Sequence, residues 1–494
     1  MKFVSTRGGH SVTGAEAVVR GVAPNGGLFV PEAFPKISDD EIGSMLEMDY
    51  AERTALILCK FFDWLDYEEL LTELKGIYAR FEGDPAPLVR IDEGKYFLEL
   101  YHGPTCAYPD LSVLILPYLL KKSAESLGIQ EKLLILAATG GDTGKAAFEA
   151  FKNQENVKLQ VFYPEEGVSA MQRMFLTTEE GNNLSVVGVR GNFDDCQVTI
   201  NNLLASEEMR EKIKAKGYIA TSANSVNIAR IAAQTAYYFS AYCDLVSSEQ
   251  IALGDKADFT LPTGGFGGAV SAYYAKEMGL PVGRILCASN KNNVVTDFIR
   301  TGAYNAKRNF FRTMSPSMDI LIASNLERLV FELSGREGAL TGERMSALNE
   351  TGKYSITSEE LKTLRAQFSA GFTSEDDTVE CIYEYFSEYG YPMDTHTGVA
   401  MSVADRYLEK RDPLAPQHVM VVVSPANPYK FPQDVLYALS GNDAKDSFKC
   451  VKRINLLTAM KVPEAVKNVR YKPILHKTIV APKDIAAEVL KFVE

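Results

Sequence analysis

Residues 133–153 read LLILAATGGDTGKAAFEAFKN, and this stretch decides the fold class. Its apolar run Leu133–Ala138 is typical of a buried strand, and Lys145–Asn153 has the spacing of a helix. A glycine-rich turn from Ala138 to Gly144 joins the two. A strand that passes through a glycine turn into a helix is the repeating unit of a parallel α/β sheet.

The same alternation continues along the chain. A second unit runs from the strand Phe259–Pro262 through Pro262–Gly268 (PTGGFGG) into the helix Ala269–Met278. Another long helix is expected at Ser225–Cys243. Further strands are expected at Tyr96–Tyr101, Leu159–Tyr163, Ser185–Val189, Ile285–Ala288 and Val419–Ser424. We therefore predict an open α/β fold with mainly parallel sheets.

The first ninety or so residues have a different pattern. Glu41–Phe62 and Tyr67–Arg80 have the periodicity of amphipathic helices, after a glycine- and proline-rich opening. We expect a mainly helical N-terminal domain at 1–95. A smaller α/β domain at 96–255 and a larger one at 256–494 would follow, with boundaries near residues 95 and 255.

Composition excludes several classes of protein. The 494 residues include 46% hydrophobic side chains, as in ordinary globular proteins, and the formal net charge is −12. An acidic chain is not suited to nonspecific binding of nucleic acid or anionic membranes, so neither is expected as a partner. The longest apolar stretch, Leu111–Leu120, is too short to span a bilayer. The opening MKFVSTRGGH lacks the apolar core of a secretory signal.

Seven cysteines lie far apart, and no pair has C-x-x-C spacing. This spacing predicts neither a metal site nor a disulfide framework. A reduced, cytoplasmic location is expected. The sequence does not predict the oligomeric state.

The two glycine-rich turns are candidate anion sites, because free backbone N–H groups at a helix start attract phosphate or carboxylate. The first contains Thr139, Gly141, Asp142 and Thr143. The second is Gly264-Gly265-Phe266-Gly267-Gly268. Neither has the G-x-G-x-x-G or G-x-x-x-x-G-K-[ST] spacing of nucleotide loops. A tight structural turn is the alternative for each, but two such loops favour a ligand with two anionic ends.

Motifs along nearly the whole chain are similar to those of the threonine synthase family. They begin with Phe3–Gly8 (FVSTRG) and Gly26–Pro31 (GGLFVP). The later matches are His102–Thr105 (HGPT), Gly141–Gly144 (GDTG), Val189–Asp195 (VRGNFDD), Ser222–Ser225 (SANS) with Asn227 and Arg230, Ala288–Asn290 (ASN), Ser315–Asp319 (SPSMD), Ser324–Arg328 (SNLER), Asp394–Thr397 (DTHT) and Pro428–Phe431 (PYKF).

The resemblance implies the fold of fold-type II pyridoxal-phosphate (PLP) enzymes, which is like that of tryptophan synthase β. In this family, PLP on a lysine binds O-phosphohomoserine, and the lysine moves protons at Cα and Cβ. Phosphate leaves from Cγ, and water adds at Cβ to give threonine. The cofactor is the electron sink, while the protein supplies orientation and proton transfer.

The sequence departs from the family at the cofactor. Where the family has H-G-P-T-x-A-F-K-D, residues 102–110 read HGPTCAYPD, so Pro109 occupies the Schiff-base lysine position. Pro425 replaces the hydroxyl residue that contacts the pyridine nitrogen. The phosphate loop G-N-F-G-[ND] has become Gly264–Gly268, without its polar side chains, and Gly140 replaces a serine of the substrate loop. We predict that the chain carries no covalent PLP.

Few residues are candidates for replacement chemistry, so the catalytic group is left unassigned. Cys106 and Tyr108 flank the lost lysine and are weak candidates for nucleophile or acid/base, although both residue types more often only pack. Lys145 and Lys291 are possible replacement amines, with surface or anion-pairing roles as the alternative. For His396, a structural hydrogen bond is favoured over titration.

Three polar residues are expected to bind substrate. Arg230 lies on an apolar helix, where its charge needs a partner such as a bidentate anion, or else a salt bridge. The resemblance adds Asn224 as a substrate-binding residue. It also adds Asn290, which is a candidate either for a substrate hydrogen bond or for loop capping.

Three hypotheses follow from these observations. The first is a repurposed enzyme acting on a phosphorylated or activated amino-acid-like substrate, without Schiff-base PLP. The second is a non-catalytic pseudoenzyme that binds a small anion or a partner protein. The third is residual threonine synthase activity with non-covalent PLP. An absorbance spectrum with and without borohydride helps to discriminate them, because it reports any imine between a lysine and PLP.

Overall fold

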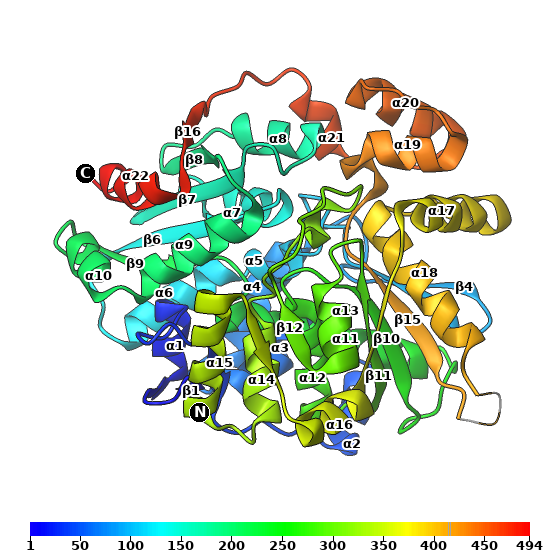
Figure 1. The fold of residues 1–494 in the computed structure, drawn as a ribbon, viewed down its shortest axis with the longest axis horizontal. Coiled ribbons are helices and arrows are strands. Elements are labelled where there is room, and N and C mark those ends of the chain that lie inside the picture. The colour runs from blue at the N-terminus through cyan, green and yellow to red at the C-terminus, as the bar shows by residue number, and fades with distance from the viewer. Residues whose placement is uncertain (413, 415) are drawn as a thin grey trace.

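Two parallel sheets form the frame of the protein (Figure 1). The computed structural model describes residues 1–494 except 413 and 415. The larger, six-stranded sheet is parallel apart from its edge pair β5–β4. Its strands, in spatial order, are β14 (Phe368–Phe372), β11 (Val282–Ser289), β10 (Ala257–Pro262), β15 (Val419–Ser424), β5 (Lys95–Glu99) and β4 (Leu88–Asp92).

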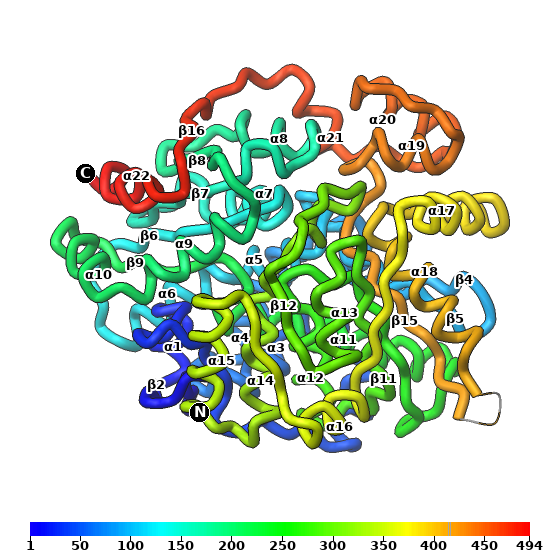
Figure 2. Tube along the Cα trace, in the orientation of Figure 1, coloured from blue at the N-terminus to red at the C-terminus, as the bar shows by residue number. Residues whose placement is uncertain are grey.

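The smaller sheet has five strands, all parallel. A late segment of the chain supplies one edge strand and an early segment the centre, as the colours of Figure 2 show. The spatial order is β16 (Thr478–Val480), β8 (Leu184–Val189), β7 (Val157–Pro164), β6 (Lys132–Ala138) and β9 (Tyr218–Ser222).

Two small antiparallel sheets complete the strands. The order β2-β1-β3 joins Ser11–Thr13, Lys2–Ser5 and Phe29–Pro31, and β12 (Ala303–Asn305) pairs with β13 (Lys353–Ser355). The first sheet lies at the start of the chain, beside the helices of the N-terminal part. That part is therefore mainly helical, with a small sheet that the sequence did not predict.

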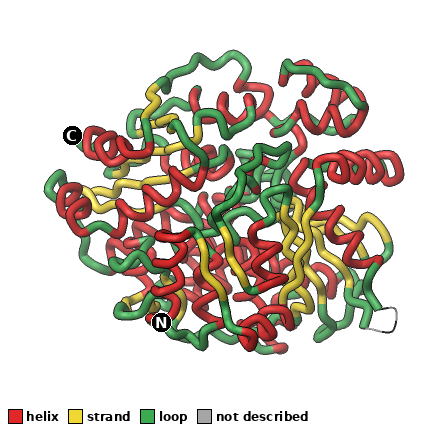
Figure 3. Tube along the Cα trace, viewed as in Figure 1, coloured by secondary structure: helices red, strands yellow, loops and turns green. Residues whose placement is uncertain are grey.

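Helices cover both large sheets (Figure 3). The longest, α11, is buried along most of its length and packs against α3 and α12. The helices are α1 (Gly14–Arg20), α2 (Asp39–Met45), α3 (Tyr50–Phe61), α4 (Tyr67–Tyr78), α5 (Asp110–Val113), α6 (Leu116–Ser126), α7 (Asp142–Phe151), α8 (Ala170–Thr177), α9 (Phe193–Ala205), α10 (Glu207–Lys214), α11 (Ile228–Ser247), α12 (Gly267–Met278), α13 (Val294–Thr301), α14 (Leu326–Leu333), α15 (Gly338–Thr351), α16 (Ser358–Gln367), α17 (Glu375–Tyr389), α18 (Thr395–Glu409), α19 (Pro432–Ser440), α20 (Ser447–Thr458), α21 (Glu464–Val469) and α22 (Ile485–Phe492). Short 3₁₀ turns lie at Pro316–Met318, Pro428–Lys430 and Pro482–Asp484.

The predicted α/β class and its parallel strands are confirmed. The prediction of one helix over Glu41–Phe62 is wrong, because the chain breaks between α2 and α3. Asp49 accepts the backbone N–H of Glu52, and the Glu52 carboxylate accepts the N–H of Asp49. This reciprocal capping starts a new helix where the apolar periodicity alone suggested a continuous one.

Membership of the sheets crosses the expected boundaries near residues 95 and 255. Strand β5 joins the sheet built mainly from residues after 255, and β16 joins the sheet of residues 132–222. The domain limits therefore stay a prediction, while the two sheets define the framework of the site.

Within the described residues, no helix combines the length and apolar character needed to cross a bilayer. The same residues contain no cluster of three or more metal-ligating side chains. All seven cysteines are free thiols.

Candidate functional site

The glycine loop between β10 and α12 presents a row of free backbone donors. From Gly264 to Ala269, no backbone N–H donates a hydrogen bond to any described residue. Phe266 adopts the left-handed conformation, with φ +68°, and its carbonyl accepts the first helical bond from Val270. This loop therefore opens α12 with uncapped amides, a geometry suited to an anionic oxygen.

Two neighbouring glycines in this loop have different surroundings. A Cβ at Gly264 would lie 2.5 Å from the carbonyl oxygen of Ser317, whereas a Cβ at Gly265 would meet no atom within 4 Å. Gly264 is therefore required by close packing. Gly265 borders open space.

That space is a cavity of about 90 Å³, called here the glycine-loop cavity. Three tyrosines are among the residues that line it: Tyr108, Tyr237 and Tyr238. The Tyr238 hydroxyl donates to the carbonyl of Gly268 at 2.8 Å. Other lining residues include Asp142, Ser317, His396 and Pro425.

Arg230 is a buried cation with one unused donor. Its Nε donates to the Ser112 hydroxyl at 3.0 Å, and its Nη1 donates to the Ala223 carbonyl at 3.1 Å. Its Nη2 is buried and makes no hydrogen bond of ordinary geometry to a described residue, but the Tyr108 phenol lies close enough to interact with the guanidinium. Burial lowers the pKa of the guanidinium. A buried donor left unpaired costs about 1–3 kcal/mol, and more when charged, so this geometry favours an anionic ligand.

A second cavity of about 90 Å³, the arginine cavity, adjoins the Arg230 side chain and is also lined by Thr139, Thr143 and Asn325. It shares four lining residues with the glycine-loop cavity: Tyr108, Asp142, Gly265 and Ser317. The two cavities are therefore neighbours. Two of the predicted anion-binding features, Arg230 and the glycine loop, lie in one site.

Of Cys106 and Tyr108, the two weak candidates for a catalytic residue, Tyr108 is the one that lines this site. Burial raises the pKa of its phenol, and the nearby Arg230 charge opposes that shift. The phenol is therefore protonated near neutral pH and can donate a proton or a hydrogen bond. Its position follows from the backbone, because Tyr108 N–H donates to the Pro425 carbonyl at 2.8 Å.

The turn before α7 has fewer free donors than the sequence suggested. The Thr139 hydroxyl oxygen accepts the N–H groups of Gly141, at 2.8 Å, and Gly144, at 2.9 Å. Gly141 has φ +127°, and a Cβ there would meet the Gln172 side chain at 2.5 Å. Asp142 holds a fixed negative charge beside the cleft. The expected anion site at this turn is thus partly filled by the protein itself.

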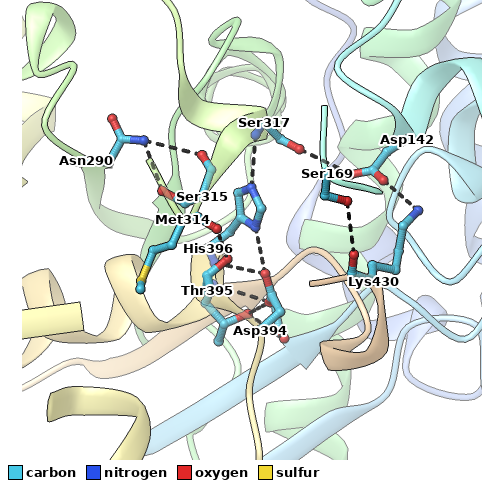
Figure 4. A network of polar contacts seen from close by, with 12 residues as sticks. Asp142, Ser169, Asn290, Met314, Ser315, Ser317, Asp394, Thr395, His396 and Lys430 are labelled. Carbon is cyan, nitrogen blue, oxygen red and sulfur yellow. Dashed lines mark hydrogen bonds and ion pairs between the residues drawn. The ribbon is translucent and has the colours of Figure 1, made fainter. Parts of the chain in front are cut away.

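The expected substrate-binding asparagines are engaged with protein groups. Asn224 accepts from the Ala138 N–H at 2.8 Å and donates to the Ala138 carbonyl at 2.7 Å. Asn290 donates to Ser315 (Figure 4). It also donates to Asp319, and it lines neither cavity. Asn290 is therefore held within its own loop, and a role in binding substrate stays a prediction.

Cys106 and the lysines lie outside the two cavities. Burial raises the pKa of the Cys106 thiol to about 12, and Cys106 lines a separate cavity with His102. Lys145 forms ion pairs with Glu149 and Glu179, and Lys291 lies over the Phe311 ring. No lysine is among the residues that line either cavity.

His396 has a structural role in this geometry. Its Nδ1 lies 2.8 Å from the Asp394 carboxylate, and its Nε2 accepts the N–H of Ser317 at 3.1 Å (Figure 4). Both ring nitrogens are therefore used, with the proton on Nδ1. The imidazole fixes the Ser317 loop against the glycine loop.

Sequence analysis missed several residues that line the site, among them Ser317, Asn325 and Tyr237. Ser317 and Asn325 line the cavities, although both lie within matched motifs, so their positions were a usable signal. Tyr237 lies in the apolar run of α11, and nothing in its sequence context distinguishes it from a core tyrosine.

A larger, open space leads to these cavities. It measures about 580 Å³ and shares Gly140, Phe193, Pro316 and Asp319 with the arginine cavity. Both glycine-bearing turns lie at the carboxyl ends of parallel strands, where ligands enter open α/β sheets.

An open, mainly parallel α/β fold with a glycine loop at a helix start beside the cleft defines the class as that of fold-type II PLP enzymes. The model of the threonine synthase N terminus matches residues 2–78. Threonine synthase from Pseudomonas aeruginosa is 34% identical over 440 residues, which cover 88% of this chain and 90% of that protein. The chain belongs to the threonine synthase family.

Human threonine synthase-like 1 is also similar, at 35% identity over 86% of this chain, but this chain spans only 58% of the length of that relative. Among solved structures, PLP-bound threonine synthase from Brucella melitensis has a TM-score of 0.84 and 31% identity, with both chains fully covered. The yeast threonine synthase structure has a TM-score of 0.83 and 26% identity over 99% of each chain.

The residues of this chain fit one end of PLP but not the other. The uncapped amides of the glycine loop suit a phosphate group. For the aldehyde end, no lysine lines either cavity, and the Lys430 ammonium is paired with Asp142 at 2.5 Å. A PLP held as a Schiff base therefore does not fit these side chains, and the function proposed below includes no step through it.

Proposed function

We propose that this protein is an enzyme that acts on a phosphorylated or otherwise activated amino-acid-like substrate without Schiff-base PLP. The observation that carries the proposal is the buried Nη2 of Arg230, which makes no hydrogen bond of ordinary geometry to a described residue, in a cavity that adjoins the free amides of the glycine loop. These two groups would bind the two anionic ends of one small molecule. Its phosphate and carboxylate are the natural occupants.

The role of Tyr108 supports catalysis rather than binding alone. A protonated phenol between the two anion positions would donate its proton to an oxygen that leaves from the substrate. Its Arg230 neighbour would stabilise the phenolate that remains. Asp142, Ser317 and His396 would hold the cleft in shape.

The experiment is calorimetric titration and thermal unfolding with inorganic phosphate, O-phosphohomoserine and PLP, together with an assay of phosphate release. We expect phosphate and O-phosphohomoserine to bind and to raise the melting temperature. Arg230→Met should abolish that rise. Arg53→Met is the matched control, because Arg53 is another buried arginine, paired with Asp244 far from the cleft.

The outcomes separate the three hypotheses. Binding without turnover of any phosphorylated amino acid would favour a pseudoenzyme that holds an anion. Turnover that depends on added PLP would favour residual threonine synthase activity. No heat and no thermal shift with any of the three ligands would contradict the anion site itself.

A further inference from the structure

A cavity of about 550 Å³, called here the His102 cavity, lies apart from the cleft. Among the described residues, it shares no lining residue with the glycine-loop cavity, the arginine cavity or the open space that leads to them. Segments 106–108 and 425–427 are joined by backbone hydrogen bonds, and each supplies residues to both the His102 cavity and the glycine-loop cavity. These segments therefore lie between the two cavities. The volume is within the range of small-molecule sites.

Glu99, the last residue of β5, is a buried carboxylate that lines this cavity. Its Oε2 lies 2.7 Å from Nε2 of His102, and its Oε1 accepts the Tyr391 hydroxyl at 2.5 Å. The Tyr101 hydroxyl lies 3.4 Å from that of Tyr391 and is also close to Glu99. Burial alone would raise the pKa of the Glu99 carboxyl, but the contacts with His102 and Tyr391 outweigh it and hold the pKa below its ordinary value. The carboxylate is therefore charged near neutral pH.

The protons of this cluster are directed inward, toward Glu99. A carboxylate only accepts hydrogen bonds, so Nε2 of His102 and the Tyr391 hydroxyl both donate to it. Because the Tyr391 proton is used in this way, the Tyr101 hydroxyl donates to Tyr391 or to Glu99. Burial raises the pKa of both phenols well above the ordinary value, so both keep their protons.

The cluster is therefore left with acceptors and a negative charge for any ligand in the cavity. Nδ1 of His102 has no hydrogen-bond partner among the described residues, and in the neutral ring it is an acceptor. The Tyr101 oxygen also keeps a lone pair. The rings of Tyr101 and His102 stack with their centroids 4.8 Å apart, and the face of a tyrosine ring attracts cations. These properties match a ligand that carries a positive charge and N–H donors.

Two cations are among the residues that line the cavity, and both are already paired. Arg80 lies 3.0 Å from the Glu149 carboxylate, and Lys461 lies 3.2 Å from that of Glu82. An anionic ligand would have to compete with these carboxylates. Several other lining residues are apolar, and they include Pro104, Pro392, Met460, Pro463 and Ala465.

We propose that the His102 cavity binds a small molecule that carries a primary ammonium group on an apolar body. The ammonium would donate to Nδ1 of His102 and to the Tyr101 oxygen, while Glu99 supplies the compensating charge. The apolar body would lie against the prolines and Met460. This site is separate from the cleft, so it stands or falls independently of the function proposed above.

Calorimetric titration with benzylamine tests the proposal, with benzyltrimethylammonium and benzoate as comparison ligands. Benzylamine carries a primary ammonium beside an apolar ring. Benzyltrimethylammonium keeps the charge but has no N–H donor, and benzoate has the opposite charge. We expect benzylamine to bind at one site, about tenfold or more tightly than either comparison ligand.

Variants of the lining residues locate the binding. Glu99→Gln should weaken benzylamine binding by about tenfold or more, and Tyr101→Phe by about threefold or more. Glu464→Gln is the matched control, because Glu464 lines the same cavity but its exposed carboxylate is paired with Lys467. It should change the affinity by about twofold or less. Arg230→Met, which alters the cleft, should leave benzylamine binding unchanged.

Each of four results would overturn the proposal. They are no binding of benzylamine to the wild type, equal or tighter binding of either comparison ligand, equal effects of Glu99→Gln and Glu464→Gln, and loss of benzylamine binding in Arg230→Met. Thermal unfolding checks that each variant is folded. If Glu99→Gln does not fold, Tyr101→Phe decides the question, and unchanged affinity in that variant would overturn the proposal.

Discussion

The Lys430 ammonium lies 2.5 Å from the Asp142 carboxylate, and both side chains are buried. Figure 4 shows this pair, and Lys430 also donates to the carbonyl of Thr105 at 3.1 Å. Asp142 begins α7 beside the smaller sheet, while Lys430 follows β15 of the larger sheet. This ion pair therefore joins the two halves of the framework across the cleft.

Removing one partner of this pair is expected to be costly. Lys430→Met would leave the Asp142 carboxylate buried and unpaired, which lowers the free energy of unfolding by about 3–5 kcal/mol. The double variant Lys430→Met with Asp142→Asn should be destabilised by less than the sum of the two single variants. Urea denaturation of the four proteins measures this coupling. Additive losses would contradict a direct pair.

The same pair predicts a dependence on acid. Burial alone would raise the pKa of the Asp142 carboxyl, but the Lys430 charge outweighs it and holds the pKa below its ordinary value. The stabilisation is therefore present above the unfolded pKa of about 4 and is lost as the pH falls through the lower folded value. Wild type should lose more stability than the double variant over that range.

The glycine loop offers a substitution that separates binding from folding. A methyl group at Gly265 meets open space, so Gly265→Ala should leave the melting temperature nearly unchanged. It should nevertheless weaken phosphate binding, because the methyl enters the glycine-loop cavity. Gly264→Ala should destabilise the fold through the Ser317 carbonyl. Gly76→Ala, in the exposed part of α4, is the control and should raise stability by up to about 1 kcal/mol without changing binding.

Much of the framework could be predicted because its signals are local. The apolar runs of β6, β10 and β15 are buried on both faces and stand out in any short window. Strand β9 reads YIATS, β14 reads FSAGF and β16 reads TIV, so these strands carry weak signals. They form because strands from distant segments supply their partners, and this is a tertiary effect.

The site could be predicted in part for the same reason. Arg230 and the glycine loop were identified because a charge on an apolar helix and a run of glycines are visible in sequence. The engagement of Asn224 by Ala138, and of the Thr139 hydroxyl by two amides, depends on exact loop geometry. Tyr237 needed the fold, since only packing brings it beside Tyr108.

Tyr108 is expected to affect catalysis more than binding. Tyr108→Phe removes the proton donor but keeps the ring that packs between the cavities. The dissociation constant for phosphate should change by about twofold or less, while phosphate release should slow by about 10²–10⁴-fold. Tyr237→Phe is the matched control on the same cavity. Equal effects of both substitutions on turnover would contradict a specific role for Tyr108.

We expect no lysine of this chain to form an imine with PLP. Intact mass after borohydride reduction in the presence of PLP should show no pyridoxyl adduct. Pro109→Lys should fold, because Pro109 already has helical backbone angles of −60° and −23°. It should recover little threonine synthesis, since Pro425 supplies no hydroxyl to the ring nitrogen and Tyr108 borders the cavity. A stoichiometric adduct on wild type would refute this prediction.

Asp194 gives stability a dependence on pH in the opposite direction to Asp142. Its Oδ2 accepts the N–H groups of Leu321 at 2.7 Å and Ile322 at 3.1 Å, while its Oδ1 is buried without a partner among the described residues. Burial raises the pKa of this carboxyl to about 7, so the folded protein keeps a proton that the unfolded chain releases above about pH 4. Folding stability should therefore fall as the pH rises from about 4 to 7, by up to about 4 kcal/mol from this group.

Asp194→Asn removes the titration, and its stability relative to wild type should increase between pH 5 and pH 8, as measured by denaturant midpoints. Gln197→Ala, on the same helix α9 and without a carboxyl, should shift the midpoint equally at both pH values. An equal shift for Asp194→Asn would show that its carboxyl does not titrate in this range.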